Sequence, residues 1–494
     1  MAKLIGKNKI SLLNIEEMVR EIYTPYTTPH YRDYKDQKNN IDSLISYIKN
    51  ERFKEFINKL KNTSINFKNT DVLTHKIDLS NVIYPYKYLS RGAYGATFLA
   101  KFKKEKNKKK KGDDDYFVVK YEIVRDRDYE HCQDEYIDCI DNNKNNEQRC
   151  KVKEIYCRLD SAFIEIYINK NYIQKLNSRN FAMFYAFFMC PTFKILFDKS
   201  GKYPTDEFLN KFIENKQFCV QCKDSNVEAE KMHVFSVYEY IPGKTLAKYI
   251  QSNSFSIKTL YKIFLQLFGA LSTAQIPNKI YYNHNDLHCN NIMVQNYQKS
   301  QKYTYFLPYQ KTKNSVSSNK RAVIIDQGNA SLICKQKDIN NINNTNNTNN
   351  TNNIQYTGVY GWYKKSITKV IKNYNSPYAD VFRVITDSYS RMLDCNKSRE
   401  ILKKLKDIIN DLFSLDGMPP STRGLFDFFK SNMSNIELST VCSDFIENEQ
   451  ELWFDRYVIY LEKNLSSENF SILMKKIENI TYEFAFNYFN NFRI

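Results

Sequence analysis

Two short apolar segments near the middle of the chain each carry polar side chains at one end. Asp286 and Asn291 lie five residues apart in a polar loop that runs directly into the apolar stretch Ile292–Val294. A second apolar stretch, Ala322–Ile325, ends at Asp326. Short apolar runs bounded by polar turns are typical of buried strands. The sequence therefore predicts buried strands that deliver two carboxylates and an amide to the loops at their ends.

These side chains match the needs of phosphoryl transfer. A carboxylate must orient the attacking hydroxyl and accept its proton, and oxygen ligands must hold the magnesium ion that bridges the phosphates. Asp286 is predicted to be the catalytic base. Asn291 is predicted to belong to the catalytic set and to bind the metal, and Asp326 is predicted to be the second metal ligand.

A glycine-containing turn lies earlier in the chain, between two predicted strands. Because Gly92 and Gly95 lack side chains, backbone amides there can approach phosphate oxygens. Lys120 follows the apolar run Phe117–Val119, which places a cation at the end of a buried strand. Alone, such a turn is more often structural, and such a lysine is more often a surface residue. The predicted nucleotide contacts in this region are Leu89, Gly92, Ala93, Tyr94, Gly95, Thr97 and Lys120.

The order and spacing of these motifs resemble the protein kinase superfamily over residues 84–490. The resemblance implies an α+β, two-lobed fold with a β-rich N-lobe and a mainly helical C-lobe. It also implies transfer of the γ-phosphate of ATP to serine or threonine hydroxyls of a protein substrate, with Mg²⁺ as cofactor. The Asn-, Lys- and Ile-rich composition further resembles kinases encoded by large DNA viruses. The motifs are Gly92/Gly95, Lys120, His284-x-Asp286 with Asn291, and Asp326-x-Gly328.

The resemblance gives two more acidic residues a role. Glu165 is expected to lie on a helix and to pair with Lys120 as part of the catalytic set; an exposed helical glutamate is the alternative. Asp380 resembles the buried aspartate that braces the catalytic loop.

The segment Val237–Gly243 resembles the hinge that holds adenine through backbone groups. By this resemblance Glu239 and Ile241 contact the nucleotide, and Tyr238 occupies the gatekeeper position.

The chain also departs from the usual kinase pattern at four positions. Ser90 replaces the first glycine, Asn285 replaces an arginine, His288 stands where lysine is usual, and Gln327 replaces a phenylalanine. No Ala-Pro-Glu motif closes the activation segment. Two alternatives to an active protein kinase therefore stay open, a nucleotide-binding pseudokinase scaffold and a small-molecule kinase of the choline or aminoglycoside type.

Composition shifts divide the chain into three predicted regions with three inserts. A helix is predicted to begin after Ser256 and to end before Pro277. The last stretch is predicted to be a helix with one apolar stripe, formed by Leu473, Ile477, Ile480, Phe484 and Tyr488. The regions are an N-terminal helical extension (1–83), an N-lobe (84–241, insert 123–157) and a C-lobe (242–494, inserts 295–320 and 339–353).

The net charge of +18 favours acidic partners, although much of it is local. Eight lysines lie in Lys101–Lys111, and three aspartates, Asp113–Asp115, follow after one glycine. A solvated hairpin tip is the simpler interpretation, and a docking patch for an acidic surface is the alternative. Nucleic acid is not expected to be the primary ligand.

The eleven cysteines form an odd count, and the N-terminus lacks the pattern of a signal peptide. Free thiols and a reducing intracellular compartment are therefore expected, namely host cytoplasm or virion if the chain is viral. Cys219-x-x-Cys222 and the set Cys132, Cys139, Cys150 and Cys157 are alternatives as metal ligands. Phe181–Phe193 is too short to span a bilayer and is interpreted as buried core.

Overall fold

The computed structural model describes part of the 494-residue chain. Predictions for Ala93, Tyr94, most of the lysine-rich tip, the Asn/Thr repeat at 339–353 and the cysteines of the 123–157 insert lie outside the described residues. The described residues are 52, 54–56, 58, 79, 82–92, 95–103, 116–124, 165–166, 168–169, 172–176, 178–190, 205–219, 232–276, 280–335, 354–358, 377–395, 397–413, 463, 466–467, 470–471, 474 and 480–491.

The chain has an α+β structure and divides into two compact units. The first unit comprises Met1–Asn177 and Ala182–Tyr240, and the second comprises Ser178–Phe181 and Ile241–Ile494. The main passage between the units therefore falls between Tyr240 and Ile241, inside the segment that was predicted to be a hinge.

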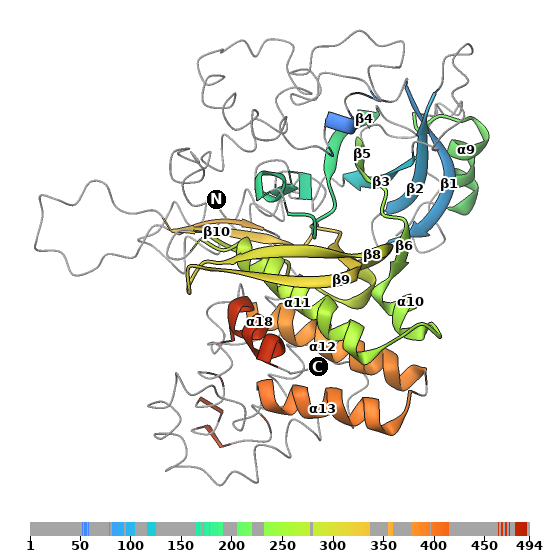
Figure 1. Cartoon of the computed structure of the whole chain (residues 1–494). Helices are drawn as coiled ribbons and strands as arrows, with labels where there is room; N and C mark the ends of the chain where they lie inside the picture. The colour runs from blue at the N-terminus through green and yellow to red at the C-terminus, as the bar shows by residue number, and fades with distance from the viewer. Residues whose placement is uncertain are drawn as a thin grey trace, which may run out of the picture. The chain divides into compact units, whose positions relative to one another are not determined.

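The first unit is built on one antiparallel sheet with the strand order β1-β2-β3-β5-β4 (Figure 1). The predicted hairpin of residues 97–102 with 116–121 is formed, with Leu99 opposite Val118. Strand β3 continues to Val124 and pairs there with β5, so the insert predicted to begin at residue 123 begins later. The elements are β1 (Ile83–Arg91), β2 (Gly95–Phe102), β3 (Tyr116–Val124), η2 (Ile173–Leu176), β4 (Phe184–Cys190), α9 (Asp206–Glu214) and β5 (Met232–Glu239).

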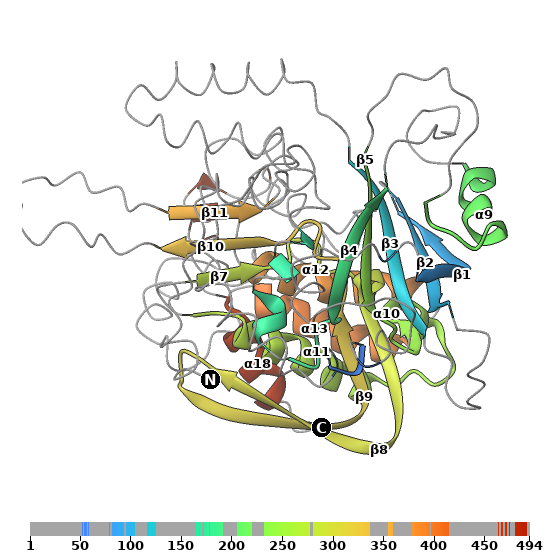
Figure 2. The same ribbon diagram turned by 90° about the horizontal axis from the view of Figure 1, so that it is seen from above.

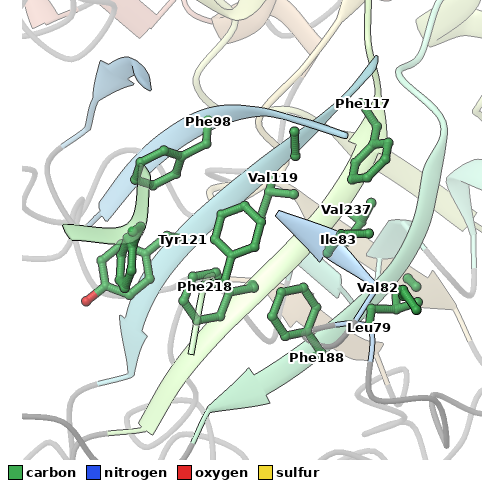
Figure 3. Packing of buried hydrophobic residues seen from close by; sticks show 14 of the residues in the cluster. Leu79, Val82, Ile83, Phe98, Phe117, Val119, Tyr121, Phe188, Phe218 and Val237 are labelled. Atoms are coloured by element: carbon green, nitrogen blue, oxygen red, sulfur yellow. The ribbon is translucent and has the colours of Figure 1, made fainter. Parts of the chain in front are cut away.

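Aromatic side chains fill the core of the first unit (Figure 3). The Phe212 ring, on α9, lies 5.7 Å from the Phe98 ring and 5.6 Å from the Tyr121 ring, which come from β2 and β3. Phe56, at a helical position of the predicted N-terminal extension, stacks on Tyr185 of β4 at 4.3 Å. This part of the extension is therefore packed into the core of the first unit.

The second unit combines helices with two small antiparallel sheets, β6-β8-β9 and β7-β10-β11 (Figure 2). Helix α11 packs against β8, β9 and α18, and α12 packs against α10, α13 and α18. The elements are β6 (Gly243–Thr245), α10 (Leu246–Gln251), α11 (Ile257–Thr273), β7 (Ile280–Asn283), η3 (Cys289–Asn291), β8 (Ile292–Leu307), β9 (Thr312–Ile324), β10 (Ser331–Lys335), β11 (Ile354–Gly358), α12 (Pro377–Asp394), α13 (Arg399–Phe413) and α18 (Tyr482–Asn491).

The polar segment predicted to be an insert at 295–320 forms the long hairpin of β8 and β9 (Figure 2). Tyr303, Tyr305 and Val316 are buried, whereas their neighbours along the strands are mostly exposed. One face of the hairpin thus covers α11, and the polar face is turned to solvent. Gly269 of α11 allows this close packing, because a Cβ there would lie 2.6 Å from the Tyr305 ring.

The C-terminal helix α18 buries a different stripe from the predicted one. Tyr482, Phe486 and Phe489 are buried, whereas Phe484 and Tyr488 are only half-buried. Aromatic residues occupy so many positions of this segment that periodicity alone does not identify the buried face. Ile480, which also belonged to the predicted stripe, is buried.

Helix α11 begins after Ser256, as predicted, but the Ser256 side chain makes no capping hydrogen bond. Thr245 does cap α10, since its Oγ1 accepts from the backbone N–H of Lys248 at 3.3 Å.

We therefore expect Thr245→Ala to lower the free energy of unfolding by about 1 kcal/mol, because an N-terminal N–H of α10 loses its partner. Ser256→Ala is the matched control and should change it by less than about 0.5 kcal/mol. Urea denaturation of both variants measures the difference, and equal losses would contradict the assignment of the two caps.

Within the described part of the chain, no helix is both long and apolar enough to cross a membrane. The apolar stretch beginning at Phe181 contributes strand β4 to the first-unit sheet, and its described side chains are largely buried, in agreement with the prediction.

Candidate active site

Lys120 lies at the centre of a small polar cluster in the first unit. Its Nζ lies 2.5 Å from Glu165 Oε2 and 3.1 Å from Glu122 Oε1. Glu165 is at a helical position and is 1% exposed, so the alternative of an exposed glutamate is wrong. The ion pair expected between Lys120 and Glu165 is formed, and Glu122 is a second carboxylate that the sequence analysis did not identify.

Tyr238 completes this cluster. Its hydroxyl donates to Glu165 Oε1 at 2.7 Å, while Lys120 binds the other oxygen. Burial raises the pKa of Tyr238 well above its ordinary value, and the charge of Glu165 raises it further. The hydroxyl therefore keeps its proton and holds the carboxylate in place.

We expect Tyr238→Phe to lower the free energy of unfolding by about 2 kcal/mol, since a buried carboxylate loses a donor. Tyr249→Phe is a matched control, because its hydroxyl donates to a backbone carbonyl, that of Ser254 at 3.3 Å, rather than to a buried carboxylate. Chemical denaturation followed by far-UV circular dichroism measures the free energy of unfolding of both variants. A larger loss in the control would show that Tyr238 is not a significant partner of Glu165.

The predicted phosphate-binding turn joins β1 and β2. The backbone N–H of Gly92 donates to the carbonyl of Gly95 at 2.9 Å and closes the turn. A Cβ on Gly95 would lie 1.8 Å from the carbonyl oxygen of Tyr121, whereas a Cβ on Gly92 would meet nothing within 4 Å. Strand packing therefore requires glycine at 95. Leu89 is 43% exposed on β1, and Thr97 lies opposite Lys120 in the sheet.

The predicted hinge residues fall on either side of the boundary between the units. Glu239 ends β5, and its carboxylate accepts from Arg52 at 2.6 Å and from the backbone N–H of Met183 at 3.2 Å. Ile241 begins the main part of the second unit and is buried.

The loop of Asp286 is held together by short hydrogen bonds within the second unit. The Nδ2 of Asn291 donates to the backbone carbonyl of Asp286 at 2.9 Å and lies 3.4 Å from Asp286 Oδ2. The ring of His284 bonds the carbonyl of Ile325 at 3.0 Å. The loop is thereby tied to the segment that follows β9.

Strand pairing brings the two predicted metal ligands together. Ile292 lies opposite Ile324 in the β8–β9 ladder, and the backbone N–H of Ile325 donates to the carbonyl of Asn291 at 2.9 Å. Asn291 therefore precedes one strand at the same end where Asp326 follows the other.

The segment after β9 also reaches back to Asp286. Asn285 Nδ2 donates to the carbonyl of Asn329 at 3.0 Å, and Asn329 Nδ2 donates to Asp286 Oδ2 at 3.3 Å. Asn285 and Asp326 both have positive φ, 62° and 60°. Asn and Asp tolerate this left-handed conformation best among residues with side chains, and strained backbone is often found at functional sites.

Helix α12 supports the loop from one face. Asp380 Oδ2 accepts from the backbone N–H of His284, and Asp387 Oδ2 accepts from that of Cys289, each at 2.7 Å. Between them, Arg383 NH2 lies 3.7 Å from Asp286 Oδ1. The three helix residues are spaced three and four apart, so they form one helical stripe.

Asp380 also binds the C-terminal helix. The hydroxyl of Tyr482 donates to Asp380 Oδ2 at 2.5 Å, and both residues are fully buried. Burial raises the pKa of the Asp380 carboxyl, although the nearby His284 and the hydrogen bonds from Tyr482 and the His284 N–H act in the opposite direction.

Gln327, which replaces an apolar ring in the kinase pattern, is 3% exposed. Its Oε1 accepts a hydrogen bond from the hydroxyl of Tyr282 on β7. The buried amide therefore has a polar partner inside the second unit, which offsets the desolvation that an unpaired amide would suffer.

Sequence reasoning identified Asp380 but missed Glu122, Arg383, Asp387 and Tyr482. The signal for Arg383 and Asp387 was present, because they extend the stripe of Asp380 along one helix at a spacing of three and four residues. Tyr482 gave no such signal, since its partner Asp380 lies 102 residues away in sequence. Glu122 lies only two residues from its partner Lys120 on the same strand, and its burial beside that lysine became evident only in the folded sheet.

The donor atoms near Asp286 suit a magnesium ion bound together with phosphates. The amide nitrogen of Asn291 is engaged by Asp286, so its amide oxygen would be the atom that binds the ion, and Asp326 would supply carboxylate oxygens. Mg²⁺ is usually bound by one or two such groups plus substrate phosphates. Among the described side chains, no group of three or more His, Cys, Asp or Glu is arranged to hold a metal ion.

The expectation of free thiols is wrong for Cys219, which is disulfide-bonded and so cannot be a zinc thiolate. An odd number of cysteines requires only that at least one thiol be unpaired. Cys289 and Cys395 are free, and Cys289 is buried in the loop of Asp286.

No protein-family model matches the chain, and no curated protein is significantly similar to it.

Proposed function

We propose that the chain is an ATP-dependent protein kinase of a divergent, two-lobed type that phosphorylates serine or threonine. The observation that carries this proposal is the meeting of Asp286, Asn291 and Asp326 at one end of the β8–β9 ladder. A carboxylate base beside two oxygen ligands is the arrangement that phosphoryl transfer requires.

The first unit supplies a second, independent argument. Lys120 emerges from the central strand of an antiparallel sheet and is fixed by Glu165, which suits an anchor for nucleotide phosphates. The passage between the units at Tyr240–Ile241 is also where the hinge was predicted. These features together favour a nucleotide-dependent transferase over a protein that only binds partners.

In the proposed reaction, Asp286 accepts the proton of the substrate hydroxyl as its oxygen forms a bond to the γ-phosphorus. The bond between the γ-phosphorus and the bridging oxygen breaks, and ADP leaves with that electron pair. Lys120 binds the phosphates. Asn291 and Asp326 would hold Mg²⁺, which when bound neutralises charge on the phosphate oxygens.

Two alternative functions predict different outcomes of one experiment. A small-molecule kinase would phosphorylate an alcohol such as choline or an aminoglycoside, and a pseudokinase would bind nucleotide without transfer. The 53 residues between Asp326 and Asp380 leave room for a peptide-binding segment, which favours a protein substrate.

The test uses the purified full chain with γ-labelled ATP, Mg²⁺ and separate panels of proteins, choline and aminoglycosides. Label on serine or threonine of proteins supports the proposal. Label on a small alcohol alone would contradict the protein kinase proposal and support a small-molecule kinase. Nucleotide binding without any transfer would identify a pseudokinase.

A further inference from the structure

Arg383 is the cation that lies beside the proposed catalytic base in the second unit. Its NH2 lies 3.7 Å from Asp286 Oδ1, and its side chain is 15% exposed. The other carboxylate oxygen, Oδ2, faces Asn291 and Asn329 at 3.4 and 3.3 Å and the ring of His288 at 3.7 Å. The two oxygens of Asp286 therefore have different surroundings, with the guanidinium on one and neutral amides on the other.

His288 does not provide an equivalent charge. Its Nδ1 accepts a hydrogen bond from the backbone N–H of Asn290 at 3.2 Å, and this ring nitrogen must be unprotonated to accept it. The neutral ring then carries its hydrogen on Nε2, the atom that faces Asp286. His288 is thus a neutral ring beside Asp286.

The position of Arg383 is fixed by its helix. One turn before it, Asp380 binds the loop at His284, and one turn after it, Asp387 binds the loop at Cys289. Because both contacts are made to backbone N–H groups of the loop, α12 cannot rotate without breaking them. The guanidinium is consequently held beside Asp286.

We propose that Arg383, on helix α12, is a positioning residue. Its guanidinium supplies the positive charge beside the base, which the neutral ring of His288 does not supply. This inference rests on the proposed kinase function. An anionic base must approach a phosphoryl group that is itself anionic, and a fixed cation next to the base offsets their repulsion where solvent is partly excluded.

The experiment exchanges the cation between the two positions. Steady-state kinetics compare wild type with Arg383→Gln, His288→Lys and the double variant, together with the melting temperature of each. Arg383→Gln should lower kcat about 100-fold with little change in KM for ATP, as expected when one preorganised electrostatic contact is lost. Adding His288→Lys to Arg383→Gln should raise kcat at least about tenfold above that of the single variant Arg383→Gln. Lys404→Gln, which removes a lysine from an exposed ion pair with Glu400 on α13, is the charge control and should stay within twofold.

Each result separates the two proposals. If wild type transfers no phosphate, the kinase function fails and the role of Arg383 fails with it. If wild type is active and Arg383→Gln retains its kcat, only the role of Arg383 is overturned. If Arg383→Gln is inactive and His288→Lys restores nothing, Arg383 has a structural role, and a lower melting temperature in both variants would support that reading.

Discussion

Replacing Asp286 with asparagine should lower the rate of phosphate transfer by about 10²–10⁴-fold, the contribution usually made by a general base. Asparagine has nearly the same shape and can still accept from Asn291 and Asn329, but it cannot take the proton of the attacking hydroxyl. Because the Asp286 side chain is 25% exposed, its replacement should leave the melting temperature almost unchanged. Single-turnover transfer from γ-labelled ATP measures the rate.

Two further measurements make this result specific. Asp394→Asn removes an exposed carboxylate at the end of α12 and should keep the wild-type rate. Stabilisation of Asp286→Asn by ATP and Mg²⁺ in a thermal-shift assay should resemble that of wild type, since the nucleotide contacts are elsewhere. An Asp286→Asn protein with wild-type turnover would remove Asp286 from the mechanism.

Asp380→Ala should lower the free energy of unfolding by about 3–5 kcal/mol, the largest stability effect expected in the second unit. The substitution leaves the backbone N–H of His284 and the hydroxyl of Tyr482 buried without their acceptor. Removing the side chain also opens a cavity between α12 and the loop of Asp286. Urea unfolding followed by circular dichroism measures the loss.

Asp380→Asn tests the electrostatic part of this effect. A buried carboxyl with a raised pKa binds a proton more readily in the folded state, so its contribution to stability falls as pH rises above the ordinary value of 3.8. Asparagine cannot titrate. The difference in stability between wild type and Asp380→Asn should therefore shrink as pH rises through this range, and a difference that grows would contradict the raised pKa.

The strands next to the candidate site could be predicted from sequence because their signals are local. Apolar runs flanked by polar loops gave the positions of β3, the start of β8 and the end of β9. The α+β class was expected from the kinase resemblance, whereas the polar stretch 295–320 did not reveal its strands. Its alternating Tyr and Val positions are spread among Lys, Gln and Ser, so the buried face becomes evident only when α11 is packed against it.

The contacts that organise the site depended on tertiary structure. Tyr482 lies 102 residues from Asp380, and nothing in the local sequence indicates that its hydroxyl reaches a buried carboxylate. The same is true of Gln327 and Tyr282. Arg383 could in principle have been identified from the sequence, because a charged stripe on a buried helix usually has a partner. Recognising it required knowing which loop α12 faces.

The β8–β9 hairpin offers a place to graft a reporter peptide without disturbing the candidate site. The ladder is regular from Ile292 opposite Ile324 to Asn296 opposite Lys320, and it is then interrupted before Gln301. Residues 298–300 in this irregular stretch are exposed. A short epitope spliced there would be displayed to antibodies, while the five inner residue pairs continue to hold Asn291 beside Asp326.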